Sequence, residues 1–183
     1  MSEERLIRQC APTLAGIKTG SLFPCPYETR EELMADVRAF NRRFAARGLC
    51  LLPMRLENGH ALLYLYRPAE LRRDLQNGLA QEILSLAGYR CGSCECCVTD
   101  LIRRLRGRAE FPHEIGLFLG YPPEDVRGFI ENETRNYKFT GYWKVYGDEE
   151  RSRALFDKFE RCTRCYLASW ACGTGVERLA LAV

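Results

Sequence analysis

The sequence predicts an α+β fold, in which helices pack on a small antiparallel or mixed sheet, and three observations support this class. Two apolar, strand-like runs at 49–56 and 60–67 flank an Asn-Gly pair at positions 58 and 59, which is the strongest short signal for a β-hairpin. Segments with apolar residues at helical spacing follow. Aromatic residues then alternate along 139–146 as in a strand. Separate runs of strands and helices are typical of the α+β class.

Length and composition limit the kind of protein. The chain has 183 residues, of which 46% are hydrophobic and 28% charged, and this composition excludes disorder and fibrous repeats. We expect a single domain over residues 1–183. No apolar run reaches the ~20 residues of a membrane span, and residues 1–5 lead into no secretory signal. We therefore expect a cytoplasmic protein without a membrane partner.

The first elements are predicted from local signals. Residues 10–26 are rich in Gly and Pro, which favours an extended or looping segment. Thr29 and Glu32 form a capping box that begins a helix, and Gly48 ends it. The predicted hairpin comes next along the chain.

Helical patterns dominate the middle of the chain. Helices are predicted over 68–75, 79–88 and 98–107 from their apolar spacing, and the Pro122-Pro123 pair favours a further helix start. A helical insertion from about Leu71 to Glu133 is therefore expected to interrupt the sheet.

The C-terminal part is predicted to return to the sheet. Asp148 is expected to cap a long helix whose apolar stripe includes Phe159 and Cys162, and residues 176–183 to form a final strand. The residues expected to share one face of the strand at 139–146 are Phe139, Trp143 and Val145.

Several longer segments resemble one known family. They are FPHEIGLFLGYPPEDV at 111–126, GYWKVYGD at 141–148, CAPTLAGIK at 10–18 and LYLYRP at 63–68. Together they are similar to an uncharacterised bacterial family catalogued as domain of unknown function 3793, and the resemblance covers nearly the whole chain. It implies no established activity. Its most characteristic part is the His-Glu pair at 113 and 114, and it includes no fixed cysteine spacing.

Ten cysteines without a secretory signal favour reduced thiols or metal ligands over a disulfide framework. Cys91, Cys94 and Cys97 have the C-x2-C-x2-C spacing with which bacterial ferredoxins hold an iron–sulfur cluster. Cys25 and Cys10, in the opening segment, are candidates for a remote fourth ligand. The sequence thus predicts an iron–sulfur cluster or zinc, with a redox or metal-handling role. Ordinary buried thiols and reversible disulfides remain alternatives.

A second C-x2-C pair is formed by Cys162 and Cys165. Together with Cys91 and Cys94 it could make a four-thiolate zinc site. The position of Cys162 on the apolar stripe of a helix favours core packing instead.

An alternative function is a small-ligand pocket without metal. His113 and Glu114 are adjacent and could serve as acid and base, and Lys18 could bind an anion or lower the pKa of a thiol. These three are the candidate catalytic residues. Leu117 stands where the zinc-peptidase motif H-E-x-x-H requires its second histidine, which excludes that class.

Three further residues are candidates for binding a ligand or cofactor. Arg67 could complete the pocket with Lys18, His113 and Glu114, and Tyr142 and Trp143 could stack on a planar ligand. An enzyme and a binding protein both fit these residues, and so does a purely structural or partner-binding module.

Charge gives little indication of a macromolecular partner. The formal net charge is only +3, and the arginines at 103, 104, 106 and 108 are predicted to lie on the solvated face of a helix. Nucleic-acid binding calls for a wider basic face beside a recognition motif. We therefore expect a metal ion or a small molecule as partner, and no nucleic acid.

Overall fold

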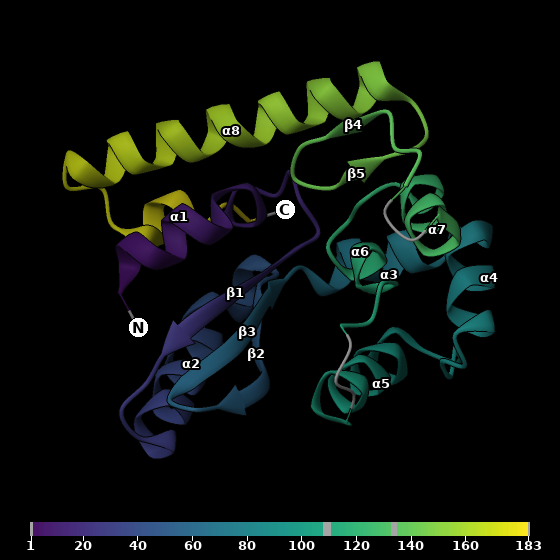
Figure 1. Cartoon of the computed structure of the whole chain (residues 1–183). Coiled ribbons are helices and arrows are strands. Elements are labelled where there is room, and N and C mark those ends of the chain that lie inside the picture. Colours follow the sequence, from purple (N-terminus) through teal and green to yellow (C-terminus); the bar gives the residue numbers. More distant parts are fainter. Residues whose placement is uncertain (1, 108–110, 133–134, 183) are drawn as a thin grey trace. The chain divides into compact units, whose positions relative to one another are not determined.

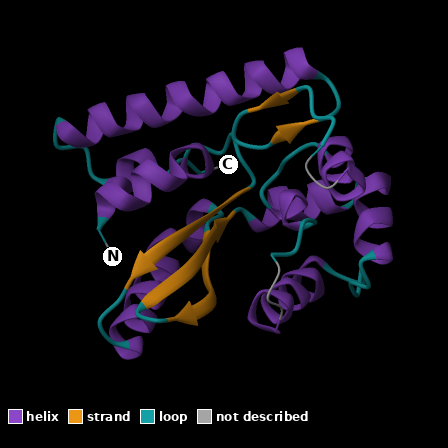
Figure 2. Ribbon diagram, viewed as in Figure 1, coloured by secondary structure: helices purple, strands orange, loops and turns teal. Residues whose placement is uncertain are grey.

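Helices and small antiparallel sheets make up the described chain, which confirms the α+β class (Figures 1 and 2). The structure is a computed structural model, and it describes residues 2–107, 111–132 and 135–182. The chain divides into two compact units. The first unit comprises residues 1–69 and 159–183, and the second comprises residues 70–158. The single-domain organisation expected from length stays a prediction. None of the described helices is long and apolar enough to cross a bilayer.

A three-stranded antiparallel sheet lies at the centre of the first unit (Figure 2). Its strands are β1 (Gly20–Pro26), β2 (Cys50–Glu57) and β3 (His60–Tyr66), in the order β1-β3-β2. β2 and β3 pair across a turn in which Asn58 and Gly59 have positive φ values of 49° and 75°. Two positive φ angles define the type I′ turn that Asn-Gly favours. The predicted hairpin is confirmed.

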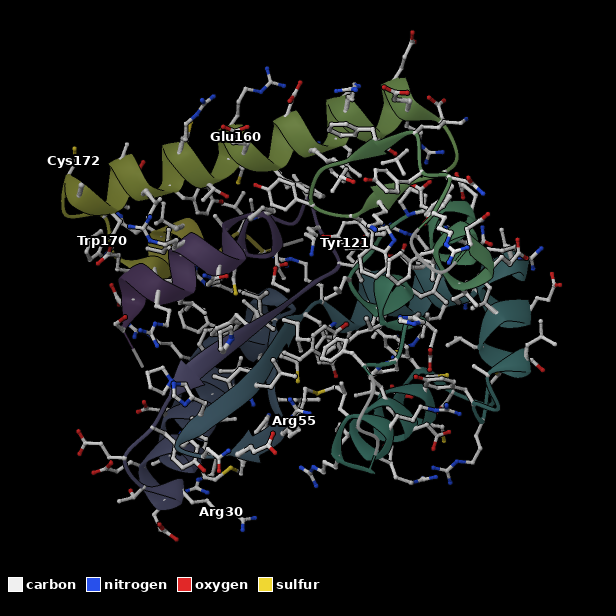
Figure 3. The ribbon with its side chains drawn as sticks, in the orientation of Figure 1. Arg30, Arg55, Tyr121, Glu160, Trp170 and Cys172 are labelled. Atoms are coloured by element: carbon white, nitrogen blue, oxygen red, sulfur yellow. The ribbon has the colours of Figure 1, made fainter. Side chains whose placement is uncertain are left out.

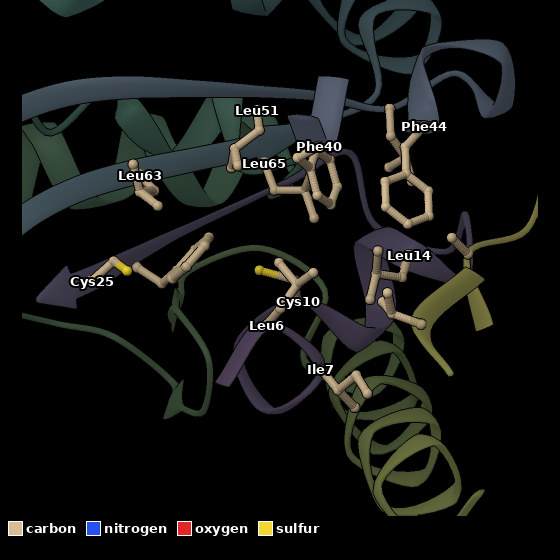
Figure 4. Packing of buried hydrophobic residues seen from close by; sticks show 14 of the residues in the cluster. Leu6, Ile7, Cys10, Leu14, Cys25, Phe40, Phe44, Leu51, Leu63 and Leu65 are labelled. Atoms are coloured by element: carbon tan, nitrogen blue, oxygen red, sulfur yellow. The ribbon is translucent and has the colours of Figure 1, made fainter. Parts of the chain in front are cut away.

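Two helices supply most of the core on one face of this sheet. They are α1 (Glu3–Leu14) and α2 (Arg30–Phe44). Alternate strand residues face them, because side chains on one face of a sheet repeat every second residue. The buried cluster takes residues from both helices and all three strands, and Figure 4 shows several of them converging below the strands: Leu6, Cys10, Leu14, Cys25, Phe40, Phe44, Leu51, Leu63 and Leu65.

The start and end of α2 follow the predicted signals. The Thr29 hydroxyl accepts a hydrogen bond from the Glu32 amide at 3.2 Å, as in the first half of a capping box. After a short 3-10 turn (Ala45–Arg47), Gly48 adopts a φ of 72° and ends the helical segment. A left-handed residue after a helix is the common role of glycine there.

Two sequence predictions for the first unit are wrong. Residues 10–14 are not looping, because they complete α1, whose apolar stripe of Leu6, Cys10 and Leu14 is buried and outweighs the helix-breaking tendency of Pro12. The last segment is not a strand either. Residues 176–179 form a short helix, α9 (Val176–Leu179), whose Val176 and Leu179 are buried, and the end of the predicted strand, Val183, lies outside the described residues.

The second unit is built mainly from helices, and all of those described except α6 lie where the sequence predicts them. Asn77 begins one of them by accepting hydrogen bonds from the amides of Leu79 and Ala80, which is the N-cap arrangement. The helices are α3 (Pro68–Leu75), α4 (Gly78–Leu86), α5 (Cys94–Gly107), α6 (Ile115–Phe118) and α7 (Pro123–Asn132).

The aromatic segment at 139–146 is a small hairpin and not the single strand expected. β4 (Phe139–Thr140) pairs antiparallel with β5 (Lys144–Val145). The chain reverses next to Gly141, where a Cβ atom would lie 2.3 Å from the Phe156 ring, so only glycine fits. This hairpin is a separate two-stranded sheet. The helical segment therefore separates two sheets and does not interrupt one, and its predicted limit at Glu133 lies outside the described residues.

A buried carboxylate joins three elements of the second unit. Asp125, in the first turn of α7, is 1% exposed. Its Oδ1 accepts hydrogen bonds from the amides of Tyr146 and Gly147 at 2.8 and 2.7 Å, and its Oδ2 accepts one from the Ser152 hydroxyl at 3.3 Å. Because the partners come from the segment directly after β5 and from α8 (Glu149–Ala171), this side chain joins α7 to both of them.

The long helix α8 confirms the predicted cap. The Asp148 carboxylate accepts a hydrogen bond from the Arg151 amide at 3.0 Å. Residues 149–158 belong to the second unit and 159–171 to the first. Cys162 packs against the core of the first unit, as its position on the apolar stripe of α8 indicates. Its side chain is only partly buried.

Candidate cysteine site

A short turn between α4 and α5 carries the cysteine cluster of the second unit. The turn begins after Gly88, whose φ of 77° ends the preceding helical segment. At its other end the Ser93 hydroxyl accepts a hydrogen bond from the Cys96 amide at 3.2 Å, so that Ser93 acts as the N-cap of α5. The four cysteines from 91 to 97 thus occupy this turn and the first turn of one helix.

An ion pair fixes the turn against its own helix. The Asp100 carboxylate is 4% exposed. It accepts hydrogen bonds from the Arg90 amide at 2.9 Å and from the Arg90 guanidinium at 2.8 to 3.2 Å, and Arg103 lies 2.9 Å away. The hydrogen bonds from Arg90 lower the pKa of Asp100 to about 2. Asp100 is therefore charged at neutral pH and holds the residue that precedes Cys91.

A second buried carboxylate supports the same turn from the other side. The Tyr89 hydroxyl donates a hydrogen bond to Glu114 Oε1 at 2.9 Å, and the Arg104 guanidinium lies 4.3 Å from the Tyr89 ring centroid and 3.7 Å from Glu114. Burial, followed by the Glu114 charge and hydrogen bond, raises the pKa of Tyr89. Tyr89 therefore keeps its proton, and Glu114 positions the start of the cysteine turn.

Three thiols of the turn gather around one cavity of about 400 Å³. The Cys91 thiol donates to the Tyr89 carbonyl at 3.5 Å, and the Cys97 thiol donates to the next carbonyl, that of Arg90, at 3.8 Å. Burial, and then the neighbouring Cys91 and Cys94 thiols, raise the pKa of Cys97 to about 12. The three side chains thus lie close enough to influence one another.

The remaining wall of this cavity combines polar side chains with Leu75 and Leu84. Arg72 of α3 and Glu95 of α5 form an ion pair at 3.2 Å, and Gln76 and Gln81 also line the cavity. Burial and the Glu95 charge raise the pKa of Cys94, with a smaller opposing effect of Arg72. Reactive cysteines need a lowered pKa, so this arrangement does not favour catalysis by a free thiolate.

The thiols do not form a ready metal centre. In the described ranges no group of three or more His, Cys, Asp or Glu side chains has an arrangement that could hold a metal ion. Cys91 is exposed, Cys94 and Cys96 are half-buried and Cys97 is buried.

The expected remote ligand, Cys25, lies in the core of the first unit. It is 3% exposed within the core of the first unit, where its thiol donates to the Pro26 carbonyl at 3.5 Å. Cys10 is likewise fully buried in that core. A thiol enclosed among core side chains gives no support to a metal ligand, and the role expected for Cys25 stays a prediction.

The side chains of His113 and Glu114 have different surroundings, and the acid and base roles expected for them stay a prediction. Glu114 is 7% exposed and faces Tyr89 and Arg104. The adjacent His113 is exposed, and its ring meets the Phe129 ring edge-on at 4.9 Å. The side chain of Glu114 is thus a structural support in this unit, whereas the expected catalytic role of His113 stays a prediction.

Arg67 is a structural residue of the first unit. It is 2% exposed, and its guanidinium donates to the carbonyls of Thr13, Leu14, Arg47 and Leu181 at 2.7 to 3.0 Å. These bonds use four of the five N–H groups of an arginine. Most of the donors are taken by the backbone, which gives no support to ligand binding, and that expected role stays a prediction.

Lys18 lies between α1 and β1 in the first unit, whereas His113 and Glu114 belong to the second. Its Nζ donates to the Gly20 carbonyl at 2.5 Å. Burial lowers the pKa of Lys18 from 10.5 to about 8, and the nearby Cys10 thiol opposes this change. Burial also raises the pKa of Cys10, and the opposing effect of the Lys18 charge is smaller, so Cys10 keeps its proton at neutral pH.

The Lys18 environment leads to a pH-dependent prediction. A lysine with a lower pKa in the folded state binds fewer protons there, so its contribution to stability rises as pH increases from about 8 to 10.5. Replacing it with methionine (Lys18→Met) should therefore raise the free energy of unfolding at pH 7, by up to about 3 kcal/mol. This gain should shrink toward pH 10. Urea unfolding of both proteins from pH 7 to 10 measures the difference, and parallel curves would contradict the expectation.

The two aromatic candidates differ in exposure. Tyr142 is 48% exposed. The Trp143 ring stacks on Tyr121 at 5.0 Å and lies 5.2 Å from Phe129, so it is part of the aromatic packing of the second unit. Its indole Nε1 is buried, and no hydrogen-bond partner is present among the described residues. The predicted stacking of a planar ligand on this pair is not tested by the geometry.

Comparison with protein families adds one finding. The model of a family described as a protein of unknown function, DUF3793, matches residues 6–180. The chain belongs to this family. Searches of the curated proteins and of the solved structures gave no match. The DUF3793 match includes both the cysteine turn and the Glu114 support, and it confirms the resemblance seen in the sequence.

Proposed function

We propose that this DUF3793 protein binds one thiophilic metal ion or a small iron–sulfur cluster through Cys91, Cys94 and Cys97. The observation that carries the proposal is the gathering of these three thiols around one cavity at the start of α5. The C-x2-C-x2-C spacing is the one with which ferredoxins hold three irons of a cluster. Thiolate ligands select Zn²⁺, Cu⁺ and iron–sulfur clusters over hard cations such as Mg²⁺.

The surroundings of the thiols are consistent with ligation. Cys91 and Cys97 each donate a long hydrogen bond to a backbone carbonyl, and such weak bonds cost little to replace. A metal ion would displace the thiol protons despite the raised pKa values, because ligation and deprotonation are coupled. Asp100 and Glu114 fix the turn through Arg90 and Tyr89. Cys91, Cys94 and Cys97 would supply three sulfur ligands, and the fourth position is left to Cys96 or to an exogenous ligand.

The test is the metal and sulfide content of protein purified without oxygen. We expect about one zinc, or iron with acid-labile sulfide, per chain. Replacing Cys94 with serine should reduce the bound metal by at least tenfold, because a ligand is lost. Cys172→Ser is the matched control, since Cys172 is exposed near the C-terminal end of α8 (Figure 3). Equal metal content in the two variants would contradict the proposal.

A second candidate function is a reversible disulfide between Cys91 and Cys97. The specific observation is that the two thiols donate to consecutive carbonyls and that a Cys91 hydrogen bond contributes to the raised pKa of Cys97. Oxidation would form one S–S bond and pass two electrons and two protons to an oxidant such as a disulfide of another molecule. Metal-free protein that loses two hydrogens on mild oxidation, and regains them with dithiothreitol, would favour this function over metal binding.

A further inference from the structure

A second cavity lies within the second unit and contains none of the cysteines. Its volume is about 550 Å³, which is within the range of small-molecule sites. Its walls come from the end of α3, the connection between α6 and α7, and the first half of α8. Each of these segments belongs to residues 70–158.

The floor of this cavity is apolar and fixed in place. Leu117 and Tyr121 are buried, and Leu155 is half-buried. The Tyr121 ring stacks on Trp143 at 5.0 Å with an interplanar angle of 23° and meets Phe156 edge-on at 6.3 Å. Its hydroxyl donates to the Tyr142 carbonyl at 3.2 Å, and Figure 3 shows Tyr121 among the side chains of this unit. An aromatic ring supported in this way offers a preformed surface to an apolar ligand.

The rim is cationic. Arg73, Arg151 and Lys158 line the cavity together with a single carboxylate, that of Asp74. Arg73 pairs with Glu70, and Arg151 is 4.0 Å from Glu124. Lys158 has no ion-pair partner among the residues that the structure describes.

The sequence of α8 places these groups on one face. Arg151, Leu155 and Lys158 are spaced i, i+4 and i+7, so they follow one another along the same side of a helix. An apolar residue thus lies between two cations. A ligand lying along this face would meet apolar surface in its middle and positive charge at its end.

We propose that this cavity binds a small organic anion, a molecule with an aromatic or aliphatic body and one carboxylate, sulfonate or phosphate group. The body would cover Tyr121, Leu117 and Leu155, and the oxyanion would pair with Lys158 and Arg151. The lining favours this class over cations, because three positive side chains face one negative one. It favours an amphipathic anion over free phosphate, because the floor offers mainly apolar contact.

The test uses the whole reduced protein and the fluorescent probe 8-anilinonaphthalene-1-sulfonate, which has an aromatic body and a single sulfonate. We expect saturable binding of one probe molecule per chain, weakened by salt. Lys158→Glu should weaken it by about tenfold or more, because a repulsive charge replaces an attractive one. Octanoate and phenyl phosphate should displace the probe, and inorganic phosphate should do so poorly.

The control is Arg161→Glu on the same helix. Arg161 is exposed, does not line the cavity, and changes the net charge by the same amount. Urea unfolding of Lys158→Glu should match that of the parent protein, which separates loss of binding from loss of folding. The proposal is overturned if the two variants bind the probe equally, or if the probe binds without saturation. It does not depend on the cysteine site, since Cys94→Ser should leave probe binding unchanged.

Discussion

Replacing Arg67 with methionine should lower the free energy of unfolding of the first unit by about 3–5 kcal/mol. The guanidinium bonds to the carbonyls of Thr13, Leu14, Arg47 and Leu181, which belong to the end of α1, the 3-10 turn and the C-terminal segment. Without it, these carbonyls lose their charged donor in a buried region, and each unsatisfied group costs about 1–3 kcal/mol. A lysine should not restore stability, because a single ammonium cannot reach carbonyls spread around a planar guanidinium.

Urea unfolding followed by tryptophan fluorescence measures this effect. The chain has two tryptophans, Trp170 in the first unit and Trp143 in the second, so single-tryptophan variants report on each unit. Arg38→Met, at an exposed position of α2, is the matched control and should change stability by less than about 0.5 kcal/mol. A loss below about 1 kcal/mol for Arg67→Met, within the ordinary range of single hydrogen bonds, would show that the backbone carbonyls do not depend on Arg67.

Replacing Asp125 with alanine should have a comparable effect on the second unit, a loss of about 2–4 kcal/mol. The carboxylate accepts from the amides of Tyr146 and Gly147 and from the Ser152 hydroxyl. Its removal leaves two backbone amides without an acceptor and separates α7 from the β4-β5 hairpin. The Trp143 signal should therefore show unfolding at a lower urea concentration.

Two variants distinguish the Asp125 network from a general effect of charge. Ser152→Ala removes only the weakest of the three hydrogen bonds, at 3.3 Å, and should cost about 1 kcal/mol. Asp157→Ala removes an exposed carboxylate of α8 and should be nearly neutral. Similar losses for Asp125→Ala and Asp157→Ala would rule out the anchoring role.

Local signals in the sequence were sufficient for much of the fold. The Asn58-Gly59 turn, the Thr29 cap and the Asp148 cap depend on neighbouring residues only, and all three are confirmed. The segments that were predicted wrongly depend on distant contacts. Residues 139–146 could not be recognised as a hairpin, because the close packing of the Phe156 ring against Gly141 cannot be inferred from the local sequence.

In the candidate site, too, the features that depend on neighbouring residues were predicted and those that depend on distant contacts were missed. Spacing alone indicated Cys91, Cys94 and Cys97, which line one cavity. The supports of the turn were missed, because Glu114 reaches Tyr89 across 25 positions and its proximity cannot be inferred from either local sequence. The role of Arg67 in the fold was also missed. Its charge suggested a ligand, whereas its position at the end of β3 places the guanidinium among backbone carbonyls.

Cobalt(II) binding to the reduced protein tests the central proposal most directly, because thiolate coordination gives cobalt a characteristic charge-transfer absorption. We expect one cobalt ion per chain, with this absorption strongly reduced in Cys91→Ser, Cys94→Ser and Cys97→Ser and unchanged in Cys172→Ser. Each replacement removes one of the three thiols that share the cavity. Absence of thiolate absorption in the parent protein, or equal absorption in all four variants, would contradict the assignment of a metal site to this turn.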